Sequence, residues 1–288
     1  MKKIRLATRS SPLAMAQAHM AAKYIGSRIP GAEFEIVEVK TSGDKRQDWS
    51  LERCGGKGLF TKEIEESLLS GEADVAVHSA KDLPTETPEG LVLAGCMPRD
   101  GCADVLILRS GVQVPELIAS GSPRRRAQLK KIFPQAVWTE FRGNVHTRLK
   151  KLAGGFADAS VLSLAGLERL GIESYEGLEF KPIKLDVCVP AVGQGIIALQ
   201  CRAEDAEIYR PIADSQTNMA FALEREFLKS LGGGCQSAYA ANCEGDVLRI
   251  YHEECGFQKI VFPEGGDFAS RMEIVRDLAG GLREKKLH

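Results

Sequence analysis

The chain has 288 residues with 44% apolar side chains, and its formal net charge at pH 7 is −1. This length allows about two domains with their own apolar cores and leaves room for a small third one. The composition excludes a disordered chain, and the near-neutral charge excludes a protein that coats nucleic acid through overall basicity. Any basic patch must therefore be local.

The N-terminal segment and the cysteines both favour a cytoplasmic protein. Arg5 and Arg9 interrupt the apolar stretch that a secretory signal would need, and no run of residues approaches the ~18 apolar residues of a membrane span. In a reducing compartment the eight cysteines are expected to be thiols. They form no C-x-x-C pair, so we expect no bound metal and interpret most of them as small buried apolar residues.

The chain alternates short apolar runs with helical patterns, first up to residue 96 and again after a break at 97–101. In the first series, strands are predicted at 4–8, 34–39, 73–77 and 91–96. The helix after the first strand is predicted to bury one face, formed by Leu13, Ala16, Met20 and Tyr24. In the second series, strands are predicted within 103–108, 117–122, 136–140 and 157–163, and helices from Pro123, near 144–153 and up to Gly171. This alternation favours two α/β lobes with mostly parallel sheets.

The order of these elements predicts three domains. The Pro/Gly-rich stretch 186–195 can return the chain to the first lobe, where 196–201 would add a strand, and two crossings between lobes permit a hinge. Domain 1 is predicted at 1–96 and 192–212, and domain 2 at 97–191. Domain 3, at 216–288, is predicted to be a compact α+β domain with a helix over 218–230, strands over 236–243, 247–252 and 257–263, and a helix over 268–284. The sequence shows no internal repeat.

A basic segment at 121–151 is the densest chemical signal. Its basic residues, against the single acid Glu140, are Arg124, Arg125, Arg126, Lys130, Lys131, Arg142, Arg148, Lys150 and Lys151. Ser122 and Asn144 are predicted to cap two helices that follow strands, with Pro123 just inside the first. Arginines at strand ends bind carboxylate or phosphate in a bidentate manner, so an anionic ligand is expected. The lysines fit a solvated helix face equally well.

The segment AVHSAKDLPTETP, residues 76–88, places Lys81 and Asp82 between a strand end and a proline turn. A carboxylate at a strand terminus lies where α/β folds bind ligands, although taken alone Asp82 is more simply a turn residue. His78 is more simply a buried core histidine than a base. The glycine-rich segment 53–63 lacks the spacing of a phosphate loop, so it is interpreted as a lid with Lys57 as a lid contact and a helix beginning near Thr61.

The segment LGGGCQ sets Cys235 directly behind three glycines. Taken alone, such a turn is a common helix terminator and its thiol could be incidental. In order and spacing, however, a series of segments resembles the porphobilinogen deaminase family, also called hydroxymethylbilane synthases. They are ATRSSPLAMAQ, GGKGLFTKEIE, AVHSAKDLPTETPEGL, GSPRRRAQL, FRGNVHTRLKKL, LAGLERLG, PAVGQG and GGGCQ, spread from residue 7 to 236.

The resemblance implies a three-domain transferase of tetrapyrrole (haem-type) biosynthesis whose first two lobes resemble the type II periplasmic-binding-protein fold. It implies that porphobilinogen is deaminated and that four units are joined head to tail into hydroxymethylbilane. The growing polypyrrole chain would start from a dipyrromethane cofactor attached by a thioether to Cys235, and the glycines would let its rings pass close to the backbone. It further implies a monomer, whereas the near-neutral charge and the lack of a membrane-length apolar run are what predict no nucleic-acid or membrane partner.

The resemblance also implies site residues. Asp82 matches the catalytic carboxylate, which would stabilise positive charge from about 3 Å of the pyrrole N–H. Cofactor-binding residues would be Cys235, Ser79, Lys81, Asp82, Ser122, Arg124, Arg125, Arg142, Gly143 and Gln194. Substrate-binding residues would be Arg9, Ser11, Arg142, Arg148 and Arg169.

The chain departs from the family pattern at three places. Pro123 stands where relatives usually carry an apolar residue, Arg126 is an extra charge, and Ser237-Ala238 replaces a common Val-Pro. The main alternative is a non-catalytic two-lobed anion-binding module, which the fold alone would allow. That module accounts for the arginines but gives no reason for Asp82 behind Lys81 or for Cys235 on its glycine turn. Nucleic-acid binding is disfavoured because the basic segment lacks interleaved aromatic residues.

Overall fold

The computed structural model describes residues 3–45, 61–232 and 238–285 of the chain. The chain divides into two compact units. Unit 1 comprises Met1–Asp100 and Ile196–Asn218, and unit 2 comprises Gly101–Gly195 and Met219–His288. The finer division into three domains stays a prediction. Among the described residues, no helix is both long and apolar enough to cross a membrane.

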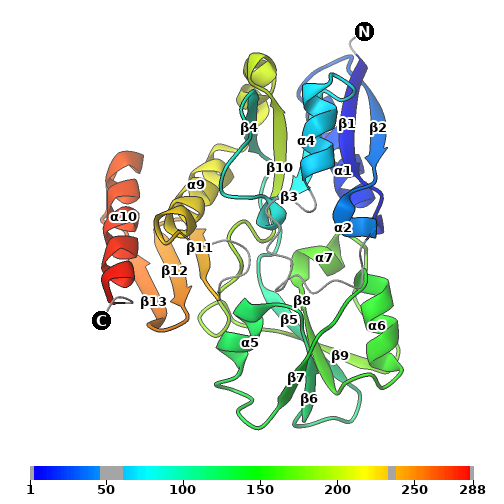
Figure 1. The fold of residues 1–288 in the computed structure, drawn as a ribbon, viewed down its shortest axis with the longest axis vertical. Helices are drawn as coiled ribbons and strands as arrows, with labels where there is room; N and C mark the ends of the chain where they lie inside the picture. Colours follow the sequence, from blue (N-terminus) through cyan, green and yellow to red (C-terminus); the bar gives the residue numbers. More distant parts are fainter. Residues whose placement is uncertain (1–2, 46–60, 233–237, 286–288) are drawn as a thin grey trace. The chain divides into compact units, whose positions relative to one another are not determined.

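Unit 1 is built on a five-stranded sheet with the strand order β2-β1-β3-β10-β4 (Figure 1). β1 runs parallel to β2 and β3, whereas β10 runs antiparallel to β3 and β4. The sheet is thus mostly parallel, with β10 opposing the other strands. The strands are β1 (Lys3–Arg9), β2 (Glu33–Val39), β3 (Val75–Ser79), β4 (Leu91–Cys96) and β10 (Ile197–Arg202).

Helices α1 and α4 cover opposite faces of this sheet. Ile25 of α1 packs in the cluster that contains Leu6, and Ile64 of α4 packs in the cluster that contains Ala7. Neighbouring strand residues point to opposite faces, which explains why Leu6 and Ala7 serve different clusters. The helical elements of unit 1 are α1 (Pro12–Gly26), α2 (Ser42–Lys45), α4 (Lys62–Leu69), η1 (Ala80–Asp82), η2 (Ala203–Asp205), α8 (Ala206–Tyr209) and η3 (Arg210–Ile212).

The most deeply buried face of α1 is not the predicted one, although Met20 and Tyr24 of the predicted face pack against the core. The residues expected on it, Leu13, Ala16, Met20 and Tyr24, are only half-buried. The buried residues are instead Ala14, Gln17, Ala18, Ala21 and Ile25. Alanines let the helix approach the sheet closely, and the larger side chains then border the contact.

Unit 2 contains a second five-stranded sheet, with the order β7-β6-β8-β5-β9. Its strands are β5 (Asp104–Arg109), β6 (Leu117–Ala119), β7 (Val137–Thr139), β8 (Ala159–Ser163) and β9 (Leu178–Pro182). Its helices are α5 (Pro123–Leu129), α6 (Val145–Ala153) and α7 (Leu164–Glu168). The sequence did not indicate β9, because an edge strand with Glu179 and Lys181 lacks the apolar pattern of a buried strand.

The two five-stranded sheets repeat one topology, although no internal repeat was predicted from the sequence. In each sheet the opposing strand, β10 or β5, is the first strand after the chain passes from the other unit. The register repeats as well, since Ile197 at the start of β10 pairs with Ser79, and Asp104 at the start of β5 pairs with Ser163. This is the strand arrangement of type II periplasmic-binding-protein lobes, so the predicted fold class is confirmed.

Unit 2 also contains a smaller three-stranded antiparallel sheet with two helices. The elements are α9 (Ser215–Ser230), whose residues from Met219 onward belong to unit 2, β11 (Ala240–Glu244), β12 (Val247–His252), β13 (Gly256–Val261) and α10 (Phe268–Lys285). Phe227, Ile250 and Val275 join these elements in one apolar core. The predicted helices and strands of this α+β region are therefore confirmed, with the first strand beginning at Ala240.

Candidate active site

A small pocket of about 60 Å³ lies in unit 1, where β1 and β3 end and α1 begins. The start of helix α1 is determined by local residues. Ser11 caps the helix by accepting the N–H of Ala14 at 3.3 Å, and Pro12 occupies the first helical position. The pocket is lined by Thr8, Arg9, Ser11, Leu13, Ala14, Gln17, Thr61, Ile64, Val77, His78, Ser79 and Asp82. It therefore collects the predicted residues Arg9, Ser11, Ser79 and Asp82 at the strand ends.

The turn after β3 presents Asp82 to this pocket. The Ser79 hydroxyl lies 2.8 Å from Nε2 and 3.0 Å from Oε1 of Gln17, and the N–H of Ala80 donates to the carbonyl of Ile196 at 3.0 Å. These bonds hold the start of η1, and the side chain of Asp82 is exposed at its end. Sequence reasoning missed Gln17, although a glutamine among the alanines of α1 was the available signal.

His78 is a buried core histidine, as interpreted from the sequence. Its Nε2 lies 2.9 Å from Oε1 of Gln200, and Nε2 of Gln200 donates to Oε1 of Glu65 at 3.0 Å. Because the Glu65 carboxylate accepts from the amide N–H, the Gln200 carbonyl is left to accept a hydrogen bond from the N–H at Nε2 of His78. Burial lowers the pKa of His78 to about 4, so the ring is neutral at pH 7 and is no general base on the Nε2 side.

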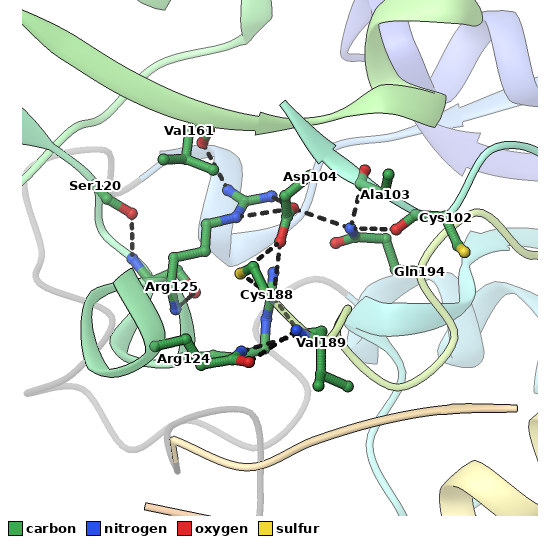
Figure 2. A network of polar contacts seen from close by, with 12 residues as sticks. Cys102, Ala103, Asp104, Ser120, Arg124, Arg125, Val161, Cys188, Val189 and Gln194 are labelled. Carbon is green, nitrogen blue, oxygen red and sulfur yellow. Dashed lines mark hydrogen bonds and ion pairs between the residues drawn. The ribbon is translucent and has the colours of Figure 1, made fainter. Parts of the chain in front are cut away.

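A charged cluster lies at the start of α5 in unit 2 (Figure 2). Ser122 caps the helix by accepting the N–H of Arg125 at 3.4 Å. Nη1 of Arg124 donates to Oδ2 of Asp104 at 2.7 Å, and Nη2 of Arg125 donates to Oδ1 of Asp104 at 2.7 Å. The same guanidinium groups also donate to the carbonyls of Val189 and Val161, at 2.7 and 2.8 Å. Both predicted arginines are thus anchored by one carboxylate.

The cluster contains more positive than negative charge. Burial alone would raise the pKa of Asp104, but the adjacent guanidinium groups of Arg124 and Arg125 hold it far below its usual range. Burial raises the pKa of the neighbouring Cys188 thiol to about 12, so that group stays neutral. Sequence reasoning missed Asp104, whose signal was an acid directly before the apolar run of β5.

Gln194 belongs to the same cluster. Its Nε2 donates to Oδ1 of Asp104 at 2.9 Å and to the carbonyl of Cys102 at 2.8 Å. The predicted residues Arg124, Arg125 and Gln194 therefore converge on Asp104, and the predicted residue Ser122 caps the helix that carries the two arginines. This convergence could not be read from the sequence, because Gln194 lies far along the chain from the helix it supports.

The remaining predicted arginines lie at other strand and helix ends of unit 2. Nε of Arg148 donates to the carbonyl of Gly143 at 2.7 Å, and Nη2 of Arg169 donates to the carbonyl of Gly195 at 2.7 Å. Gly143 has a φ of +117°, and a Cβ there would lie 2.8 Å from Cγ2 of Thr147, so only glycine fits. The predicted cap is present too, since Asn144 accepts the N–H of Thr147 at 2.9 Å.

Arg126, the extra charge of this chain, is paired within unit 2. Its Nη2 lies 2.6 Å from Oε1 of Glu140, and Nε of Arg142 lies 3.5 Å from the other oxygen of Glu140. The predicted sites at Cys235 and Lys57 lie outside the described residues. Within the described ranges, no group of three or more His, Cys, Asp or Glu side chains could hold a metal ion.

Comparison with known proteins gives consistent matches. A family model described as "Porphobilinogen deaminase, dipyromethane cofactor binding domain" matches residues 4–210. The porphobilinogen deaminase of Paracoccus denitrificans is 41% identical over 295 residues, covering 97% of this chain and 93% of that protein. Those of Brevibacillus brevis and Pelotomaculum thermopropionicum are 40% and 42% identical, covering 87% and 86% of this chain and 84% and 82% of their own lengths.

Proposed function

The chain belongs to the porphobilinogen deaminase family of tetrapyrrole biosynthesis, and from this membership we propose that it joins four porphobilinogen molecules head to tail into hydroxymethylbilane. One observation of the structure supports the proposal most directly. The exposed carboxylate of Asp82 shares a pocket with Arg9 and Ser11 at the ends of β1 and β3. An anion-binding module would use the arginine and the helix terminus but has no need of a carboxylate beside them.

The pocket suits the chemistry of porphobilinogen. This substrate carries an acetate, a propionate, an aminomethyl group and a pyrrole N–H. Arg9 and the capped N-terminus of α1 offer positive charge and polar groups to a carboxylate. Asp82 offers the opposite charge to the pyrrole N–H and to the protonated aminomethyl group. The two ends of the substrate would therefore meet complementary sides of one pocket.

We assign Asp82 the role of stabilising the transition state. When the C–N bond of the protonated aminomethyl group breaks, its electron pair stays on nitrogen and ammonia leaves. Positive charge is then shared between the methylene carbon and the pyrrole nitrogen. A carboxylate held close to the pyrrole N–H stabilises this cation more than it stabilises the neutral ring. The activation free energy of C–N bond cleavage is therefore lowered.

The dipyrromethane cofactor of the family suits the donors of unit 2. Arg124 donates hydrogen bonds to the protein from Nη1 alone, and its Nε and Nη2 have no partner among the described residues. The cluster of Arg124, Arg125 and Asp104 also has an excess of positive charge. We propose that the cofactor carboxylates are held in unit 2 by Ser122, Arg124, Arg125, Arg142, Gly143 and Gln194. We propose that Ser79, Lys81 and Asp82 of unit 1 also bind the cofactor, with Asp82 accepting from pyrrole N–H groups rather than binding carboxylates. When bound, this group supplies the terminal pyrrole carbon to which the first substrate is added. We propose that Arg142, Arg148 and Arg169 hold carboxylates of the substrate or growing chain.

The tether to Cys235 is the part of the proposal that a single experiment tests best. Intact mass of the purified protein should exceed the sequence mass by two linked pyrrole units, and the excess should be absent in Cys235→Ser. Cys255→Ser is the matched control, because that half-buried free thiol should leave the added mass in place. An unmodified protein that gains no mass after incubation with porphobilinogen would contradict the proposed function and favour the anion-binding module.

Three further expectations stay predictions: a cytoplasmic location, a monomeric state and the lack of a nucleic-acid partner. Sedimentation of the purified chain with its cofactor would test the second.

A further inference from the structure

Arg124 and Arg125 are neighbours on a helix, yet both point at one carboxylate. Consecutive residues of an α-helix are rotated by about 100° around its axis, so their side chains diverge unless a common partner draws them together. Asp104 is that partner: it receives Nη1 of Arg124 at 2.7 Å, and Nε and Nη2 of Arg125 at 3.1 and 2.7 Å. Figure 2 shows the carboxylate between the two guanidinium groups.

Asp104 is itself held in place. It is fully buried at the first position of β5, where its backbone pairs with Ser163. Gln194 donates to Oδ1 at 2.9 Å, and the Cys188 thiol donates to Oδ2 at 3.4 Å. A carboxylate bound on both oxygens has no alternative rotamer that keeps these partners. It therefore determines where the two guanidinium groups can lie.

The two arginines differ in how many of their guanidinium nitrogens remain available to bind a ligand. All three nitrogens of Arg125 donate to the protein, two to Asp104 and one to the carbonyl of Val161. Arg124 donates from Nη1 alone, and its Nε and Nη2 have no partner among the described residues. These two nitrogens form the edge of a guanidinium that binds a carboxylate with two parallel hydrogen bonds.

We infer that Asp104 is a positioning residue of the cofactor site, which holds Arg125 within the fold and orients the Nε–Nη2 edge of Arg124 toward a ligand carboxylate. The inference rests on the proposed function. The topology supports it, since Ile197 has the corresponding position in unit 1, where no arginine follows the cap of α1. The acid is thus present in the unit whose helix carries the arginines.

Loading of the apoprotein tests this inference. Full-length apoprotein is incubated with increasing porphobilinogen, and intact mass gives the fraction of chains that carry the added pyrrole units. Asp104→Asn keeps the shape but removes the charge, and Asp104→Glu keeps the charge but displaces it. We expect each to raise the concentration for half-loading by about 10-fold or more at a temperature where circular dichroism shows a folded protein. Asp186→Asn, which makes the same chemical change in the more exposed pair with Arg249, is the matched control and should load like wild type.

A second arm separates positioning from general destabilisation. If Asp104 acts through Arg124, then adding Asp104→Asn to Arg124→Leu should cause little further change in half-loading. If neither Asp104 variant folds, Gln194→Met tests the same idea by removing one bond to Oδ1, with an expected shift of about 3-fold.

Unchanged half-loading in a folded Asp104 variant overturns the inference, as does a full additional effect in the Arg124→Leu background. Where neither Asp104 variant folds, unchanged half-loading in Gln194→Met overturns it too. Failure of the wild-type protein to gain mass on Cys235 instead overturns the proposed function, so the two failures are distinguishable.

Discussion

Helices α1 and α5 start with the same cap but carry different side chains in their first turns. Each follows a strand at the corresponding position of its sheet, β1 or β6, and each begins with Ser-Pro followed four residues later by Ala-Gln. Both glutamines are buried: Gln17 bonds to Ser79, and Gln128 bonds to the backbone of Val189. The residues between differ, being Leu13, Ala14 and Met15 in unit 1 and Arg124, Arg125 and Arg126 in unit 2.

The neighbouring strands differ in step with the helices. The first residue of the opposing strand is Ile197 in unit 1 and Asp104 in unit 2. After the paired serines the charged residues lie in the other unit, because Lys81 and Asp82 of unit 1 correspond to Ala165 and Gly166 of unit 2. One framework therefore gives an exposed carboxylate, Asp82, in one unit and a buried carboxylate paired with two arginines, Asp104, in the other.

Removing the buried carboxylate should have the largest effect on stability. Asp104→Asn leaves two buried guanidinium groups without a counter-charge, and we expect a loss of about 3–5 kcal/mol in the free energy of unfolding. The triple variant Asp104→Ile, Arg124→Leu, Arg125→Ala copies the residues of unit 1 and should recover most of that loss while abolishing cofactor loading. Denaturant unfolding measures both. A triple variant no more stable than Asp104→Asn would show that the two positions are not equivalent.

Removing the exposed carboxylate should affect turnover rather than folding. Asp82→Asn keeps shape and hydrogen bonding but loses the charge that stabilises the cation, so we expect kcat to fall by about 10²–10³-fold, or roughly 3–4 kcal/mol of barrier. Its unfolding free energy should change by less than about 0.5 kcal/mol. Glu89→Gln, an exposed acid in the following turn, is the control. Near-normal kcat in Asp82→Asn would refute the electrostatic role.

His78 should make stability depend on pH, whereas the corresponding position of unit 2 holds a residue that does not titrate. The register places Leu162 of unit 2 at the position of His78. The folded pKa of about 4 lies below the usual 6.5, so the unfolded chain binds the proton more readily. The contribution of neutral His78 to the free energy of unfolding is fully present above pH 6.5. It should be lost as pH falls to about 4, which lowers the free energy of unfolding by up to about 3 kcal/mol.

Urea unfolding between pH 4 and 7 checks this prediction. His78→Leu should flatten the pH dependence relative to wild type, whatever its stability at pH 7. An equal slope in both proteins would mean that His78 does not titrate between these pH values when the chain unfolds.

The smallest effect is expected at the third arginine of α5. Arg126 and Glu140 form a pair at 2.6 Å, but their side chains are 25% and 38% exposed. Solvent screens such a pair, so Glu140→Gln should cost less than about 1 kcal/mol and the cost should shrink further in salt. A loss as large as that of Asp104→Asn would remove the distinction between the buried and the exposed charges.

The local elements were predictable from the sequence because their causes are local. Ser11, Ser122 and Asn144 cap helices whose first turns they adjoin, and these caps occur as expected. Apolar runs gave the buried strands, and the position of Asp82 after such a run placed it at a sheet edge. The edge strand β9 and the buried face of α1 were not obtained, because burial there depends on neighbouring elements rather than on the segment itself.

By itself, the sequence determined the two α/β lobes, the arginines beside helix caps and the family to which the chain belongs. Only the tertiary structure decided which charges meet. Asp104, Gln194 and Arg124 are separated by tens of residues, as are His78 and Gln200, and each pairing exists because the strand order brings distant strand ends together. The physical reason is that a buried charge must find its partner across the sheet, and periodicity along one segment carries no information about the strand beside it.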